Sequence, residues 1–153
     1  MGAEAKLKAM GLELPSMAAP AGAYVPAKRT GNLVYVAGQL PLQEGKLVCT
    51  GSVGGSVSID EAYAGARQCG LNILAVPKAQ TGSLDNIVQM IRVEGFVASA
   101  AGFTDQAKVI NGASELFAEV LGDAGSHARF AVGASELPLG ASVEIAAIVE
   151  VRD

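Results

Sequence analysis

The sequence predicts an α+β fold, in which a single mixed β-sheet carries two helices on one of its faces. Three observations predict it: the expected elements follow the order ββαβαββ, only two segments have the period of a long helix, and residues 142–151 alternate as a strand does. Two helices are too few to cover both faces of a sheet. The chain has 153 residues, the size of one domain. We assign residues 1–20 to an N-terminal extension and residues 21–153 to a single domain.

The domain begins with a predicted strand pair followed by a loop. Residues 33–37 are β-branched and aromatic, and the turn residues 30–32 precede them. Residues 42–57 hold four glycines and are expected to form a loop. Neither a GxGxxG nor a GxxxxGK[ST] motif follows the strand, so the sequence does not predict a nucleotide site.

Both helices have clear boundaries in the sequence. Ser58 and Glu61 match the S-x-x-E capping box, and apolar residues then recur at spacings of three and four. Pro77 is expected to kink or end this helix, and Gly82 to close the segment. A second apolar face predicts a helix over residues 106–121.

Three further strands are predicted at residues 87–99, 129–135 and 142–151. In the last strand, one face is entirely apolar, and the other carries Glu144 and Glu150 beside Ala146 and Ile148. This second face, with Phe96, would be bare in a monomer, which predicts a closed symmetric oligomer.

Composition excludes several classes of function. The net charge of −4 and the scattered Lys and Arg argue against nucleic acid as a partner, and no apolar run is long enough to span a membrane. The two cysteines, Cys49 and Cys69, have no metal-ligand spacing and are expected to be reduced thiols of a cytoplasmic protein. We expect no metal and no organic cofactor.

Arg129 and Glu144 are the residues that most suggest a function. An arginine presents a planar set of donors that fits a carboxylate in two parallel hydrogen bonds. A glutamate inside an apolar strand requires a partner or a chemical task. Together they predict a site for a small metabolite that carries a carboxylate, with an acidic group nearby to handle protons or water.

The chain resembles the Rid (YjgF/L-PSP) family of reactive-intermediate imine deaminases over roughly residues 24–151. Within the family it is most similar to a longer branch with a His-Ala-Arg signature, here His127 to Arg129, and a Gly-Phe-Val-Ala-Ser segment at 95–99. The other matching motifs are Ala23-Tyr24-Val25, residues 31–41 (GNLVYVAGQLP), Val109-Ile110-Asn111, and Leu137-Pro138 leading to residues 143–148 (VEIAAI).

The resemblance implies a chorismate-mutase-like fold, a homotrimer and clefts between its subunits. It implies that Arg129 holds the substrate carboxylate, that Glu144 positions a hydrolytic water, and that Tyr24, Gly38 and Asn111 line the same cleft. The chain departs from the better-known branch at Phe130-Ala131, where that branch has small polar residues. This difference concerns the identity of the substrate and whether the cleft is catalytic.

The sequence therefore favours a cofactor-independent hydrolase that converts 2-imino or enamine acids into 2-oxo acids and ammonia. The alternative is a non-catalytic or regulatory protein that binds a small carboxylate in the same cleft. Ribonuclease activity is a second rival, which the acidic composition disfavours. In the simpler structural interpretations, Arg129 forms a surface ion pair and Glu144 is solvated. His127, the only histidine, is expected to be structural because the sequence pairs it with no Asp or Ser.

Overall fold

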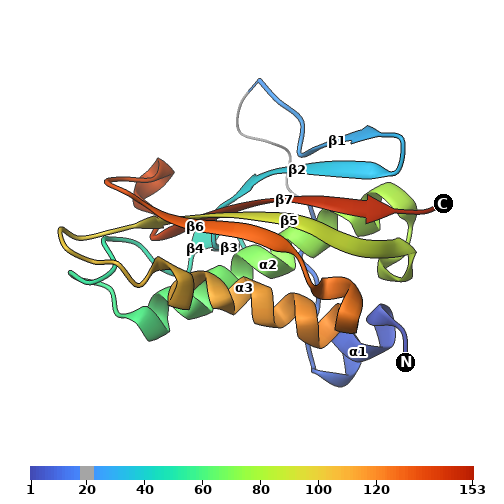
Figure 1. Cartoon of the computed structure of the whole chain (residues 1–153), viewed down its shortest axis with the longest axis horizontal. Helices are drawn as coiled ribbons and strands as arrows, with labels where there is room; N and C mark the ends of the chain where they lie inside the picture. The colour runs from blue at the N-terminus through green and yellow to red at the C-terminus, as the bar shows by residue number, and fades with distance from the viewer. Residues whose placement is uncertain (18–22) are drawn as a thin grey trace.

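One five-stranded sheet organises the computed structural model, which describes residues 1–17 and 23–153 (Figure 1). The strands lie in the order β1-β2-β7-β5-β6. All neighbours are antiparallel except β5 and β6, which are parallel. The strands span Ala27–Thr30 (β1), Leu33–Gln39 (β2), Ile87–Ala98 (β5), Ala128–Ala134 (β6) and Val143–Val151 (β7). This arrangement confirms the predicted mixed sheet.

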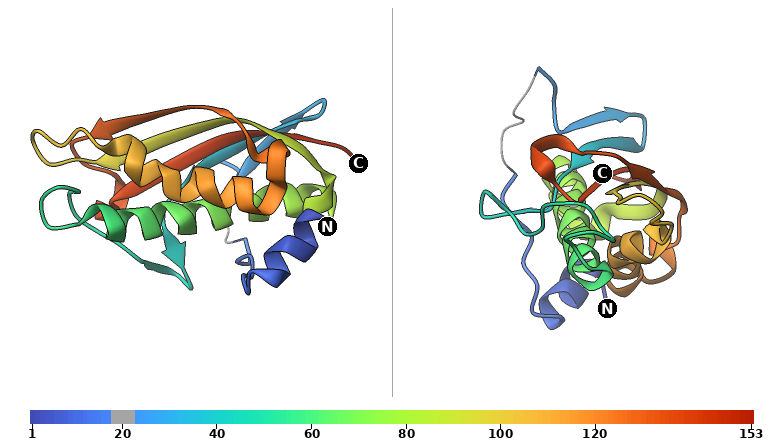
Figure 2. Two further views of the ribbon diagram at one scale, coloured as in Figure 1. Left: turned by 60° about the horizontal axis from the view of Figure 1, so that its bottom comes forward. Right: turned by 90° about the vertical axis from the view of Figure 1, so that its left-hand side faces the viewer.

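Two long helices, α2 (Ile59–Thr81) and α3 (Gln106–Leu121), lie side by side on one face of this sheet (Figure 2). A third, short helix, α1 (Ala3–Ala9), packs beneath them on the side away from the sheet. Its Leu7 is only 4% exposed and belongs to the main core, so residues 3–9 of the N-terminal extension are packed against the domain. The sequence predicted the two long helices and did not delimit α1.

The start of α2 and its close at Gly82 follow the sequence prediction. Ser58 accepts from the backbone N–H of Glu61, and the Glu61 carboxylate accepts from the backbone N–H of Ser58, which completes the capping box. Pro77, however, lies inside the helix, which continues to Thr81. The last turn is held by the backbone hydrogen bond from Gly82 to Lys78 and by the Thr81 hydroxyl, which donates to the Pro77 carbonyl. A proline thus costs this helix one hydrogen bond without ending it.

The region predicted as a loop contains a small hairpin. Strands β3 (Leu42–Gln43) and β4 (Lys46–Leu47) pair across Glu44 and Gly45, which both have positive φ angles. A two-residue turn of this kind suits the twist of a hairpin. Three single-turn 3₁₀ helices, Leu84–Asn86, Gly122–Gly125 and Pro138–Gly140, complete the regular structure.

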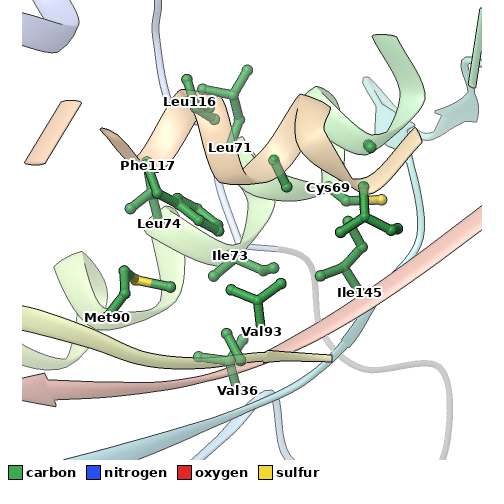
Figure 3. Packing of buried hydrophobic residues seen from close by; sticks show 14 of the residues in the cluster. Val36, Cys69, Leu71, Ile73, Leu74, Met90, Val93, Leu116, Phe117 and Ile145 are labelled. Atoms are coloured by element: carbon green, nitrogen blue, oxygen red, sulfur yellow. The ribbon is translucent and has the colours of Figure 1, made fainter. Parts of the chain in front are cut away.

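The core lies between the sheet and the two long helices (Figure 3). On β7, buried and half-buried residues alternate strictly, so every second side chain points toward the helices. These β7 residues pack with buried residues of the helices and of β2 and β5, among them Val36, Cys69, Ile73, Val93, Leu116 and Phe117. The burial alternates as the sequence predicted.

Among the residues that the structure describes, no helix covers the opposite face of the sheet, and many of the side chains on this face are apolar. Tyr35 is 45% exposed and Val132 is 42% exposed there, and Phe96, Phe130 and Ile148 are half-buried beside them. We call this surface the open face. Among residues 1–17 and 23–153, no helix is long and apolar enough to cross a membrane.

Helices α2 and α3 approach each other closely at Gly112. A Cβ atom at this position would collide with the Tyr63 carbonyl oxygen and lie 3.1 Å from the Arg67 nitrogen, both backbone atoms of α2. Gly112→Ala should therefore lower the free energy of unfolding by about 3 kcal/mol, because neither helix backbone can move without disturbing the core. Chemical denaturation measures this loss.

Gly55→Ala is the matched control, because Gly55 is exposed and its added Cβ would have ordinary contacts, the nearest at 3.4 Å. Equal stability of the two variants would contradict the close helix crossing.

Candidate functional site

Arg129 lies on β6, an edge strand, and its side chain points toward α3. Its Nη1 donates to the Ser114 hydroxyl at 2.9 Å, and its Nη2 donates to the Ala107 carbonyl at 3.2 Å. A guanidinium has five N–H donors, so these two bonds leave three that can bind a ligand. The side chain is half-buried, and α3 anchors it on one side. This is a suitable arrangement for holding a carboxylate.

Asn111 lies on the same side of α3 as the two residues that bind this guanidinium. On α3, Ala107, Asn111 and Ser114 are spaced by four and three residues, which places them along one stripe of the helix. Arg129 binds the first and the last of these residues, so Asn111 lies between its two anchors. The structure therefore places Asn111 on the stripe of α3 that Arg129 contacts.

His127 joins this group through Ser114. Its Nε2 lies 2.9 Å from the Ser114 Oγ, and its Nδ1 lies 2.6 Å from the Gly125 carbonyl oxygen. The sequence interpretation gave His127 no serine partner; the fold supplies one from 13 residues earlier. Ser114 is the site residue that sequence reasoning missed. The one feature of the sequence that could have indicated Ser114 is its position three residues after Asn111, on the same stripe of the helix.

Glu144 lies elsewhere, on the open face of the sheet. It alternates with the buried Val143 and Ile145 on β7, so its side chain points away from the helices. Partial burial removes water from the carboxylate and raises the pKa of Glu144 above its usual range. A carboxyl group with a raised pKa is better matched to proton transfer near neutral pH.

Gly38 is required by this position of Glu144. A Cβ atom at residue 38 would collide with the Glu144 Oε2, so only glycine allows the carboxylate to lie against β2. The pairing of β2 with β7 shifts register between Val36 and Gln39, where this contact occurs. The structure thus brings Gly38 and Glu144 together.

Tyr24 lies near the same end of the sheet. Two residues after it, the Pro26 carbonyl accepts a hydrogen bond from the backbone of Ala37, the neighbour of Gly38. The tyrosine is 55% exposed, which leaves its ring available to a ligand or a partner.

The five predicted site residues therefore form two groups that one protomer keeps apart. Arg129 is opposite Val93 and Glu144 is opposite Phe96, on the two strands that flank β5. Their Cα atoms are thus roughly 14 Å apart, from about 4.8 Å per strand spacing and about 3.3 Å per residue, and their side chains leave opposite faces. We call Arg129, Asn111, Ser114 and His127 the arginine half-site, and Glu144, Gly38 and Tyr24 the glutamate half-site.

Phe130 lies on the open face, not beside the Arg129 guanidinium. Its ring meets Phe96 edge to face at 5.4 Å between centroids, and the Arg92 guanidinium lies over it at 5.3 Å. Within one protomer, the difference from the better-known branch therefore alters the open face, and it leaves the contacts of Arg129 unchanged.

The two cysteines are buried, as expected of reduced thiols. Burial raises the pKa of Cys49, and raises that of Cys69 well above its usual range, so both stay protonated at neutral pH. In the part of the chain that the structure describes, no three His, Cys, Asp or Glu side chains lie close enough together to hold a metal ion.

Comparisons with known proteins agree with the fold. The chain is 41% identical over 150 residues to Protein TCP17 of Trypanosoma cruzi, with 97% of this chain and 94% of that protein covered. The crystal structure of Atu1372 from Agrobacterium tumefaciens, a protein of unknown function, is 50% identical and superposes with a TM-score of 0.91. That match covers 98% of this chain and 92% of the other.

A crystal structure of RidA from an Antarctic Psychrobacter is more distant, at 29% identity and a TM-score of 0.61 over 87% of this chain and 92% of the other. The model of the family described as "YjgF/chorismate mutase-like, putative endoribonuclease" matches residues 4–151, which include most of the N-terminal extension. The architecture and these matches lead to one conclusion: the chain belongs to the YjgF (Rid) family.

Proposed function

We propose that this protein hydrolyses 2-imino or enamine acids to 2-oxo acids and ammonia, at a site formed between two copies of the chain. The observation that carries the proposal is the division into two half-sites. One presents an anchored arginine with three open donors, and the other presents a carboxyl group whose pKa is raised by burial. The resemblance to the Rid family of imine deaminases supports the same chemistry, and a RidA protein is among the similar structures.

The reaction requires little beyond positioning. Arg129 of one copy holds the substrate carboxylate, and Glu144 of another copy accepts a proton from water as the water oxygen bonds to the imine carbon. Addition to the protonated imine gives a neutral carbinolamine and a protonated Glu144. The Glu144 carboxyl then protonates the nitrogen. The C–N bond breaks as the hydroxyl oxygen forms the C=O bond of the 2-oxo acid, the hydroxyl proton returns to the Glu144 carboxylate, and ammonia leaves. One water is consumed, and no metal or organic cofactor takes part.

The open face supplies the reason for assembly. Its exposed aromatic and aliphatic side chains would be covered by another copy, and the family resemblance favours a trimer. In a closed ring, the arginine half-site of each copy can meet the glutamate half-site of its neighbour. We expect the protein to act in the cytoplasm, where its buried thiols stay reduced.

The alternative function is binding without turnover, in which the same cleft holds a small carboxylate for regulation. Phe130 favours it, since this large ring stands where the better-known branch has a small polar residue. The endoribonuclease activity in the family description fits less well, because a chain with a net charge of −4 offers few cations to phosphates.

The oligomeric state is the first test. Light scattering at micromolar concentration should give three times the 15.4 kDa mass of one chain. A stable monomer would leave the open face exposed and would contradict a site shared between copies.

Arg129→Lys should weaken pyruvate binding by roughly 1.5–3 kcal/mol, because a single ammonium group cannot reproduce two parallel hydrogen bonds. Calorimetry measures the change, and the trimer should persist. Arg67→Lys is the control, since Arg67 pairs with Glu119 between the two helices, away from both half-sites. An unchanged pyruvate affinity in Arg129→Lys would remove this residue from the site.

Glu144→Gln separates catalysis from binding. Hydrolysis of a freshly generated imino acid should fall by about 10²–10⁴-fold, because the amide cannot accept the proton from water. Pyruvate affinity should be unchanged or higher. Glu150→Gln, on the same strand and the same face, is the control. If neither wild type nor Glu144→Gln exceeds the spontaneous rate, the protein binds without catalysing.

The same substitution has a consequence for stability. Because the pKa of Glu144 is raised on folding, the folded state binds this proton more tightly than the unfolded state does. Stability is therefore lost as pH rises from the ordinary pKa of the group through its raised value. Glu144→Gln should melt at a higher temperature than wild type at pH 7, and this advantage should vanish in acid. Equal melting temperatures at pH 7 would mean that the carboxylate is well solvated.

A further inference from the structure

A chain of hydrogen bonds leads from the backbone to the Arg129 guanidinium, and for a neutral imidazole its donors and acceptors can be assigned. The Gly125 carbonyl can only accept, so the Nδ1 of His127, 2.6 Å away, carries the hydrogen. In a neutral imidazole the Nε2 is then the acceptor, and the Ser114 hydroxyl donates to it across 2.9 Å. The Ser114 oxygen has its lone pairs left, and accepts from the Nη1 of Arg129 at 2.9 Å.

Packing holds both ends of this chain in place. The His127 ring meets the ring of Phe117 edge to face, with centroids 6.0 Å apart, and Phe117 is fully buried. At the other end, the Ala107 carbonyl accepts from the Nη2 of Arg129 and fixes the plane of the guanidinium. An arginine otherwise loses much rotational freedom when it binds a ligand. Here the loss occurs on folding, and the open donors are already oriented.

We propose that Ser114 and His127 are positioning residues, which orient the Arg129 guanidinium so that it binds the substrate carboxylate through two parallel hydrogen bonds. Neither residue needs to touch the substrate. The inference deepens the proposed function and rests on it for the identity of the ligand. The orientation of Arg129 itself can be measured without any ligand.

The first experiment uses the ligand-free protein. His127 is the only histidine, so every imidazole signal in a ¹⁵N NMR spectrum belongs to it. The neutral ring should be protonated at Nδ1, and Ser114→Ala should move the Nε2 signal. The Nη signals of Arg129 should report slow rotation about the Cζ–Nη bonds in wild type and faster rotation about these bonds in Ser114→Ala. An Nε2-protonated ring, or rapid Nη rotation in wild type, would overturn the inference.

The second experiment measures pyruvate affinity and imino-acid turnover in two pairs of variants. Ser114→Ala and His127→Phe should weaken pyruvate binding about five- to ten-fold, the effect of one lost hydrogen bond that orients a charged group. KM should rise and kcat should stay within about two-fold, since the proton-transfer group is unchanged. Ser114→Thr keeps the hydroxyl, and His127→Gln keeps an acceptor, so both should restore affinity. The exposed Ser126→Ala is the control.

A double-mutant cycle decides whether Ser114 acts through Arg129. In an Arg129→Lys background, Ser114→Ala should cause no further loss of pyruvate affinity. Equal losses in both backgrounds would overturn the positioning role.

If wild type neither binds pyruvate nor accelerates imine hydrolysis, the proposed function fails. The NMR spectra of the ligand-free protein then still decide the inference, since slow Nη rotation that depends on Ser114 supports it and rapid rotation overturns it.

Discussion

The structure depends on a sheet that buries only one of its faces. The two long helices cover this buried face and form a dense core with β2, β5 and β7. Gly112 lets the two helices approach each other closely enough to form that core. The open face retains exposed Tyr35 and Val132 and has no helix to cover it. A single copy of the chain therefore has a complete core but leaves an apolar surface exposed, and this exposed surface is the physical reason for the assembly that we propose.

The two faces of the sheet also carry different functional groups. Arg129 points toward the helices, where backbone and hydroxyl acceptors of α3 orient its guanidinium. Glu144 points toward the open face, where burial raises its pKa and Gly38 makes room for it. A cation and an acid used on the same substrate would neutralise each other if they lay in direct contact. In the proposed assembly, the opposite faces of one protomer keep the two groups apart, and a second copy is needed to bring them to the same substrate.

The sequence predicted the sheet, the two long helices and the capping box at Ser58, because these depend on local periodicity and on contacts three or four residues apart. It predicted that Gly82 closes α2 but left open whether Pro77 kinks or ends the helix, because local spacing does not show that tertiary packing outweighs one lost hydrogen bond there. The two-residue strands β3 and β4 are too short to show alternation. The pairing of Ser114 with His127 could not be predicted either, because it arises only when β6 returns along α3.

The central claim, a site shared between copies, is tested most directly by mixing two variants that are each impaired in one half-site. Arg129→Lys and Glu144→Gln chains, co-expressed so that they assemble at random in equal amounts, should be much more active than either variant alone at substrate concentrations well below KM. In a symmetric trimer about a quarter of the sites would then combine a wild-type arginine with a wild-type glutamate, so about a quarter of the wild-type rate should return. A mixed preparation no more active than its parents would contradict the shared site and place catalysis within one copy or nowhere.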